Sequence, residues 1–180
     1  MKKKILTILA PGFEEIEALT PIDILRRANM EVTIAALENN KLVCGRNAIC
    51  VQADVKLSEL KDLDFDGILI PGGPGAKKLR ESDETLKLVK DLFDKDRLIA
   101  AICAGPTVLL DAGILVNKKY TAHFSHKDEL PDMEEEKVVK DKNIITSQGP
   151  GTALHFALAI VEALEGKDVV KKIKKHICFK

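Results

Sequence analysis

Short apolar runs alternate with longer amphipathic stretches along this chain, and each kind of stretch predicts a different element. Runs of Ile, Leu, Val and Ala indicate buried strands, whereas apolar positions three or four residues apart indicate helices. Strands are predicted at residues 4–10, 32–37, 67–70, 98–102 and 143–147, with a hairpin or two short extended pieces over 42–53. Helices are predicted at 76–81, 83–95, 106–111, 152–164 and 168–177, besides a first helix that ends near 28. This order predicts a single α/β domain over residues 1–180, built on a mostly parallel, doubly wound sheet.

The first predicted helix carries both apolar and acidic positions. Its apolar positions recur at a spacing of three, at Ile16, Leu19, Ile22, Leu25 and Ala28. This stripe predicts the buried face of the helix and assigns Glu14 and Glu15 to solvent. Glu17 lies near the start of the helix, where acidic side chains stabilise the helix dipole, so the pattern alone gives it no catalytic role.

Composition excludes several classes of protein. The 28 Lys and Arg residues balance 28 Asp and Glu residues, so no net charge attracts nucleic acid or a membrane surface. Acidic residues after Pro11 end the first apolar run too early for a secretory signal, and Gly105 and Pro106 interrupt the longest apolar stretch. We therefore expect a soluble, cytoplasmic protein with no nucleic-acid or membrane partner.

The chain has four cysteines, none of them in a CxxC pair: Cys44, Cys50, Cys103 and Cys178. Because that spacing and a secretory signal are both missing, we expect free thiols rather than disulfides or a zinc site. His123 and His126 are three residues apart, but no third ligand accompanies them, so no metal is predicted.

Cys103 ends a predicted strand, and Pro106 opens the helix that follows. Ala101 and Gly105 leave room for the sharp turn of a nucleophile elbow, with cysteine in the place of serine. The helix N-terminus behind such a turn favours a thiolate and would lower the pKa of Cys103. The spacing is equally consistent with a small buried side chain that has no chemical role.

A glycine-rich loop at residues 71–75 follows another predicted strand and does not match the nucleotide-binding patterns. Because the carboxyl ends of parallel strands meet at one edge of a sheet, the backbone N–H groups of Gly73 and Ala104 could bind an oxyanion beside Cys103. A simple tight turn explains the glycines equally well. His123, at the end of an extended segment, could approach the same thiol.

The chain resembles the ThiJ/PfpI superfamily in four segments that follow the same order over nearly its whole length: ILAPGFEEIE, ILIPGGPGA, LIAAICAGPTVLL and ITSQGPGTALHFALAIVEALEGK. Within that superfamily the segments are similar to the Parkinson-disease-linked protein deglycase branch. The resemblance implies a flavodoxin-like α/β sandwich with a reactive Cys103 at the elbow. It also implies a homodimer formed through the first helix and residues 42–53.

The resemblance further implies roles for individual side chains. Glu17 becomes a protonated partner that donates a hydrogen bond to the Cys103 sulfur, since burial beside a thiolate favours the neutral carboxyl. The other matching positions are a nearby histidine, the oxyanion amides and two arginines at the mouth of the site near the dimer interface: His123, Gly73, Ala104, Arg27 and Arg46. The glycine loop is one residue shorter than in the animal members.

By this resemblance the expected activity depends on cysteine and needs no cofactor. It is the conversion of small dicarbonyls such as methylglyoxal and glyoxal to hydroxy acids by a glyoxalase III-like lyase, or the deglycation of glycated proteins. The alternative is a non-enzymatic redox sensor or chaperone that acts through oxidation of Cys103. A cysteine peptidase of the same superfamily is less favoured because Ala104 replaces the histidine of that branch, and His155-Phe156-Ala157 does not match the H-x-E of glutamine amidotransferases.

Overall fold

The computed structural model describes residues 1–60 and 64–179, and within them the main sheet has seven strands in the order β5-β2-β1-β6-β7-β9-β8. The strands are β1 (Lys4–Leu9), β2 (Glu31–Ala36), β5 (Val55–Lys56), β6 (Gly67–Ile70), β7 (Leu98–Ile102), β8 (Val138–Asp141) and β9 (Ile144–Ser147). Neighbouring strands are parallel except for β8, which pairs antiparallel with β9. The predicted mostly parallel α/β sheet is therefore confirmed; β5 and β8 are strands that the sequence pattern missed.

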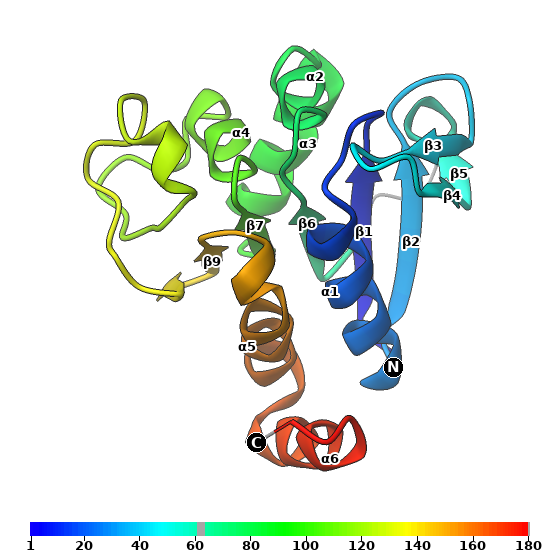
Figure 1. The fold of residues 1–180 in the computed structure, drawn as a ribbon, viewed down its shortest axis with the longest axis vertical. Helices are drawn as coiled ribbons and strands as arrows, with labels where there is room; N and C mark the ends of the chain where they lie inside the picture. The colour runs from blue at the N-terminus through cyan, green and yellow to red at the C-terminus, as the bar shows by residue number, and fades with distance from the viewer. Residues whose placement is uncertain (61–63, 180) are drawn as a thin grey trace.

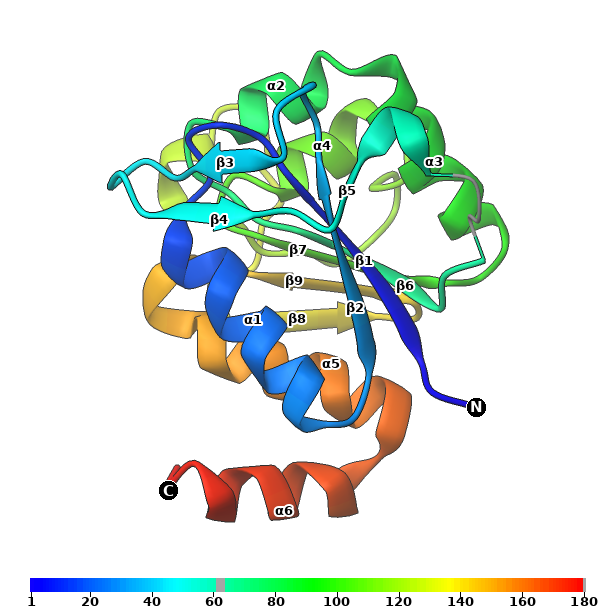
Figure 2. The same cartoon turned by 90° about the vertical axis from the view of Figure 1, so that its right-hand side faces the viewer.

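Helices cover both faces of this sheet (Figures 1 and 2). On one face α1 (Glu15–Arg27) packs beside α5 (Ala153–Glu165), and α6 (Lys167–His176) packs outside α5. The other face carries α2 (Ala76–Arg80), α3 (Asp83–Asp94) and α4 (Pro106–Asp111). Short 3-10 turns complete the elements: η1 (Leu57–Glu59), η2 (Phe124–His126) and η3 (Pro150–Thr152). No helix in the described part of the chain is long and apolar enough to cross a membrane.

The core lies in two layers, one on each side of the sheet. All five residues of β7 are buried, as a fully apolar run in a central parallel strand predicts. Successive residues of β1 face opposite layers: Leu9 packs on the α1 and α5 side, and Ile8 packs on the α3 and α4 side. A sheet that is covered in this way leaves its strand ends for ligands, so the carboxyl edge is where a site is expected.

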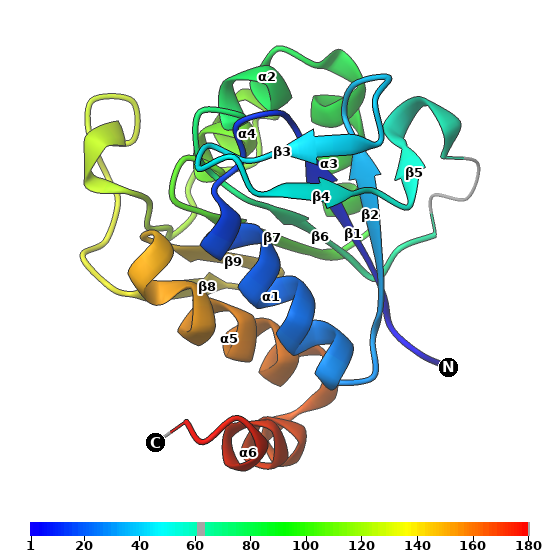
Figure 3. The same cartoon turned by 45° about the vertical axis from the view of Figure 1, so that its right-hand side comes forward.

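The predicted hairpin forms a separate small sheet of β3 (Leu42–Cys44) and β4 (Cys50–Gln52), which lies beside the start of α1 (Figure 3). Its antiparallel register places Cys44 opposite Cys50, and the two sulfurs form a disulfide. The expectation that these two cysteines are free thiols is therefore wrong. A search for CxxC spacing misses the pair because strand pairing, not closeness in sequence, brings the sulfurs together. Within the described residues, Cys103 and Cys178 are free.

The start of α1 also differs from its predicted orientation. Ile16 is 50% exposed, whereas Glu14 and Glu15 are 6% and 4% exposed. Positions three apart fall about 60° short of a full helical turn at each step, so a stripe with that spacing drifts around the helix instead of holding one face. The hairpin covers the side where Glu15 lies, and Asn47 donates hydrogen bonds to its carboxylate.

Candidate active site

Cys103 occupies the turn between β7 and the residues leading into α4. Its φ angle is +64°, in the left-handed region that side chains other than glycine rarely adopt. Its N–H donates to the Ser147 carbonyl (2.9 Å) and its carbonyl accepts from the His123 N–H (3.1 Å), so both neighbouring segments hold this conformation in place. At Gly105 a Cβ would stand 2.5 Å from the Ile70 carbonyl, which explains why a glycine follows the cysteine. The geometry is that of the predicted nucleophile elbow.

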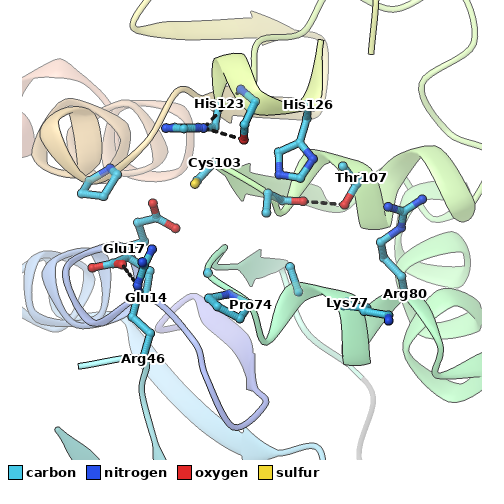
Figure 4. A pocket seen from close by; sticks show the side chains of 15 residues that line it. Glu14, Glu17, Arg46, Pro74, Lys77, Arg80, Cys103, Thr107, His123 and His126 are labelled. Carbon is cyan, nitrogen blue, oxygen red and sulfur yellow. Dashed lines mark hydrogen bonds and ion pairs between the residues drawn. The ribbon is translucent and has the colours of Figure 1, made fainter. Parts of the chain in front are cut away.

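One pocket of about 440 Å³ brings together six of the seven residues that the sequence singles out: Glu17, Arg46, Gly73, Cys103, Ala104 and His123. It opens at the carboxyl edge of the sheet, where the segments after β1, β6 and β7 meet. Figure 4 shows the Cys103 sulfur and the Glu17 carboxyl facing each other in this pocket. A half-buried thiol and a fully buried carboxyl thus share one cavity.

Glu17 is fully buried, and the glycine loop holds its carboxyl. The Gly72 N–H donates to Oε2 at 2.9 Å, while the carboxyl also interacts with the Cys103 thiol. Within the part of the chain that the structure describes, Oε1 has no further hydrogen-bond partner. A Cβ on Gly72 would stand 2.7 Å from Oε2 and 2.8 Å from the Cys103 Cβ, so only glycine allows the loop to approach both side chains.

Glu17 and Cys103 titrate as a coupled pair. Burial raises the pKa of Glu17 to about 7, and burial together with the neighbouring Glu17 carboxylate raises the pKa of Cys103 to about 12. The N–H groups of Gly73 and Ala104 lower the pKa of the thiol, but they do not outweigh burial and an ionised Glu17, so the expectation that the elbow lowers the pKa of Cys103 is wrong. Above pH 7 the pair therefore holds one proton. When that proton lies on Glu17, Cys103 is a thiolate that faces two backbone amides.

Burial of Glu17 makes the stability of the fold depend on pH. Its pKa rises from 4.5 to about 7, so between these values the unfolded chain releases a proton that the folded chain keeps. We expect the free energy of unfolding to fall by about 3 kcal/mol as pH rises through this window. The reason is that Glu17 ionises freely in the unfolded chain, whereas burial opposes its ionisation in the folded chain. Urea unfolding of wild type and Glu17→Gln at several pH values measures this contribution. An equal pH dependence in both proteins would contradict it.

His123 lies across the pocket as a neutral imidazole. Burial and the neighbouring His126 hold the pKa of His123 below its ordinary value. The Ser125 N–H donates to Nδ1 (3.3 Å), and the Ser125 hydroxyl lies 2.8 Å from the same nitrogen. Because Nδ1 accepts, the ring proton lies on Nε2, which makes that nitrogen a donor. The ring is thus suited to polarising a carbonyl rather than to removing a proton from the thiol.

The two predicted arginines are placed far apart within one chain. Arg46, on the hairpin turn, lines the pocket with its Nε 3.5 Å from Glu14 Oε2. Arg27 stands at the last turn of α1, where it binds Asp23 (2.8 Å) and lines a different cavity beside α6. The length of α1 separates it from the pocket by roughly 18 Å along the helix axis. A role for Arg27 at the mouth of the site remains a prediction that requires a second copy of the chain.

Several residues of the pocket have no counterpart in the sequence prediction: Glu14, Lys77, Arg80, Thr107, Ser125, His126 and Pro150. The sequence does contain one indication of them: the helix that becomes α2 starts directly after the glycine loop, so its first turns are expected to border the site. Arg80 is already paired, with Asp111 (2.5 Å) and Glu129 (2.7 Å). Among the described residues, no group of three His, Cys, Asp or Glu side chains could hold a metal ion.

This site and fold define a class: α/β proteins in which a strained cysteine at a strand-to-helix elbow faces a buried glutamate. Comparison with known families agrees, since the profile of the DJ-1/PfpI family matches residues 3–163. The chain belongs to the DJ-1/PfpI family.

Relatives match over almost the full length of this chain. The Parkinson disease protein 7 homolog of Danio rerio is 40% identical over 185 residues, which cover 99% of this chain and 98% of that protein. The glutathione-independent glyoxalase DJR-1.2 of Caenorhabditis elegans is 40% identical, with coverage of 99% and 97%. The crystal structure of Drosophila melanogaster DJ-1beta superposes with a TM-score of 0.95 at 38% identity and covers 100% of both chains. The flavodoxin-like fold expected from the sequence is thereby confirmed.

Proposed function

We propose that this protein converts small dicarbonyls such as methylglyoxal and glyoxal to hydroxy acids, with Cys103 as the nucleophile and no cofactor. The observation that carries the proposal is a half-buried thiol and a fully buried carboxyl that share one proton beside two backbone amides. Membership of the DJ-1/PfpI family, and a relative named as a glutathione-independent glyoxalase, support a role in defence against carbonyl stress.

The reaction starts when the Cys103 thiolate adds to the aldehyde carbon of methylglyoxal. The oxyanion that forms is stabilised by the N–H groups of Gly73 and Ala104 and takes the proton of Glu17, which gives a hemithioacetal. The Glu17 carboxylate then removes the hydrogen of that carbon as a proton, and the resulting enediol receives a proton at the neighbouring carbon. Water hydrolyses the thioester so produced, releasing lactate and the free thiol. The net change is the addition of one water molecule.

The same chemistry extends to larger substrates. A cavity of about 440 Å³ has more room than methylglyoxal fills, so it can admit a dicarbonyl adduct on a protein side chain. We therefore include deglycation of glycated proteins in the proposal. The homodimer, the single domain and the cytoplasmic location remain predictions.

Turnover without glutathione tests this function. Purified protein is incubated with methylglyoxal in the absence of glutathione and of any added cofactor, and lactate is measured against a blank without protein. We expect lactate to form in proportion to protein concentration, because the thiol that glutathione would supply is Cys103. A rate equal to the blank at all protein concentrations would overturn the proposal.

A redox sensor is the second candidate, favoured by one feature of the site. The amides that face the Cys103 sulfur would also stabilise the negative oxygens of a sulfinic acid, with Glu17 as hydrogen-bond donor. Intact mass after mild peroxide distinguishes the two functions. Addition of two oxygens at Cys103 in a protein without dicarbonyl turnover supports the sensor, and turnover without selective oxidation supports the enzyme.

A further inference from the structure

The two sides of the active-site pocket differ in chemistry. Among the described residues, the carboxylates that line it are Glu14 and Glu17, which lie on the side of α1 (Figure 4). Across the pocket, α2 and the turn η2 contribute three basic side chains that the proposed reaction does not use: Lys77, Arg80 and His126. We call these three side chains the basic wall. It lies outside α1 and residues 42–53, the surface that is expected to form the dimer.

Arg80 is held firmly in the basic wall. Its Nε and Nη2 donate to Asp111 at 2.5 and 3.1 Å, and its Nη1 lies 2.7 Å from Glu129 Oε2. Within the described chain these contacts use three of the five N–H groups of the guanidinium. Arg80 lines the pocket whereas Asp111 and Glu129 do not, so a ligand can accept from the remaining N–H groups without displacing either carboxylate. A side chain positioned in advance loses little entropy on binding.

Glu129 also positions His126. One oxygen of this carboxylate contacts Arg80, and the other lies 3.5 Å from His126 Nδ1. The contact with Arg80, with a smaller contribution from His126, holds the pKa of Glu129 below its ordinary value, so the carboxylate stays ionised at neutral pH. Figure 4 shows the His126 ring pointing into the pocket, near Cys103 and Thr107. Because Nδ1 faces Glu129, Nε2 is the nitrogen that can donate to a ligand when the ring is protonated.

Lys77 contributes a positive charge that is only weakly paired. Its ammonium lies 3.9 Å from Glu81, and the two side chains are 81% and 63% exposed. An exposed pair at this distance contributes little to stability, so the ammonium can turn to an anion in the pocket at small cost. Two carboxylates already offset the charge of Arg80. The net attraction for an anion therefore comes from Lys77 and a protonated His126, while Arg80 supplies hydrogen-bond donors.

We propose that the basic wall binds a carboxylate or phosphate group of the substrate, so that this protein prefers dicarbonyls that carry an anionic group. The inference rests on the proposed function for the reaction itself. The aldehyde and its neighbouring ketone lie at Cys103, and the anionic group of the same molecule contacts the basic wall. The cavity of about 440 Å³ has room for this group beyond the space that methylglyoxal fills. The bond changes are those given for methylglyoxal: γ,δ-dioxovalerate gains one water molecule and becomes hydroxyglutarate, and its own carboxylate forms no bond.

Binding is tested without turnover, with ketones that lack the aldehyde. Levulinate carries a carboxylate, acetonyl phosphate carries a phosphate, and methyl propyl ketone is the neutral control. Each is titrated into the full chain at constant pH and ionic strength, and the imidazole signals of His126 are followed by NMR, assigned with His126→Gln. We expect at least one of the two anions, but not the neutral ketone, to shift these signals to saturation. The anion that does so identifies the group that is bound, and no saturable shift with either anion would overturn the proposal.

Variants of α2 separate the basic wall from a general effect of charge. Lys77→Gln should raise the Kd of the anion by about fivefold or more, and Lys77→Arg, which keeps the charge, should stay within about twofold of wild type. Lys78→Gln is the matched control, because Lys78 binds Glu38 (2.6 Å) and does not line the pocket. We expect it to bind the anion as wild type does. An equal rise in Kd for Lys77→Gln and Lys78→Gln would contradict a local site.

Turnover decides whether the same contacts set substrate preference. The ratio of kcat/KM for γ,δ-dioxovalerate to that for butylglyoxal, a neutral dicarbonyl of similar size, is measured without glutathione. We expect Lys77→Gln to lower this ratio by about threefold or more, and Lys78→Gln to leave it as in wild type. A ratio in Lys77→Gln equal to that of wild type would overturn the preference. If no dicarbonyl is converted but anion binding depends on Lys77, the proposed function fails and the anion site stands.

Discussion

Replacement of Cys103 by alanine is expected to lower kcat/KM for methylglyoxal by at least about 1,000-fold. The reaction proposed here passes through a covalent adduct on this sulfur, and no other cysteine of the described chain lines the pocket. Lactate formation without glutathione measures the loss, and a thermal unfolding scan shows whether the variant folds. Because the left-handed backbone at Cys103 strains any residue with a Cβ, alanine should fold about as stably as cysteine.

Cys178→Ala is the matched control for that loss. Cys178 is the other free cysteine of the described chain, is exposed, and follows α6. We expect the Cys178→Ala variant to turn over methylglyoxal at the wild-type rate. A Cys103→Ala variant that keeps wild-type turnover would show that the chemistry lies elsewhere, and a Cys178→Ala variant that loses it would point to the same conclusion.

Replacement of Glu17 by glutamine is expected to separate thiol reactivity from turnover. Glutamine keeps the shape of the side chain and a hydrogen-bond donor but cannot carry a proton between the two substrate carbons. It also removes the carboxylate that raises the pKa of Cys103. We therefore expect iodoacetamide labelling of Cys103 near neutral pH to stay within about tenfold of wild type, while kcat for methylglyoxal falls by about 100-fold or more.

Two further glutamates complete this comparison. Glu84 is exposed on α3, so Glu84→Gln should change neither the iodoacetamide labelling of Cys103 nor kcat for methylglyoxal. Glu14 lines the pocket and pairs with Arg46, so Glu14→Gln should change turnover, by less than about tenfold. Loss of turnover in Glu14→Gln together with full turnover in Glu17→Gln would exchange the roles of these two residues.

The buried strands and the elbow could be predicted from sequence because each rests on a short local pattern. A run of five apolar residues before Cys103 indicates a central strand, and the small residues beside it indicate a turn with no room for side chains. The pairing of Glu17 with Cys103 came from family resemblance alone. In the chain the two residues are far apart, and only the parallel arrangement of β1 and β7 around β6 brings their loops together.

Features that depend on packing between distant segments were missed. Glu15 looks solvent-facing on a helical projection, and its burial becomes evident only when the hairpin is placed over the start of α1. The disulfide depends on the register of β3 against β4, which sequence spacing does not specify. Arg27 matches a family position, but a single chain cannot show whether it reaches a site.

In Figure 1 both marked chain ends lie in the lower half of the view, away from α2 and α4, whose residues line the pocket. β1 starts at Lys4 and runs toward the pocket, while the chain finishes after α6 on the far side. A tag, a fused domain or a solid support attached through the N-terminus would therefore leave the mouth of the pocket facing solution. The protein is thus suited to surface-based binding measurements that test whether a glycated protein binds at the pocket, because the attachment point does not obstruct its approach.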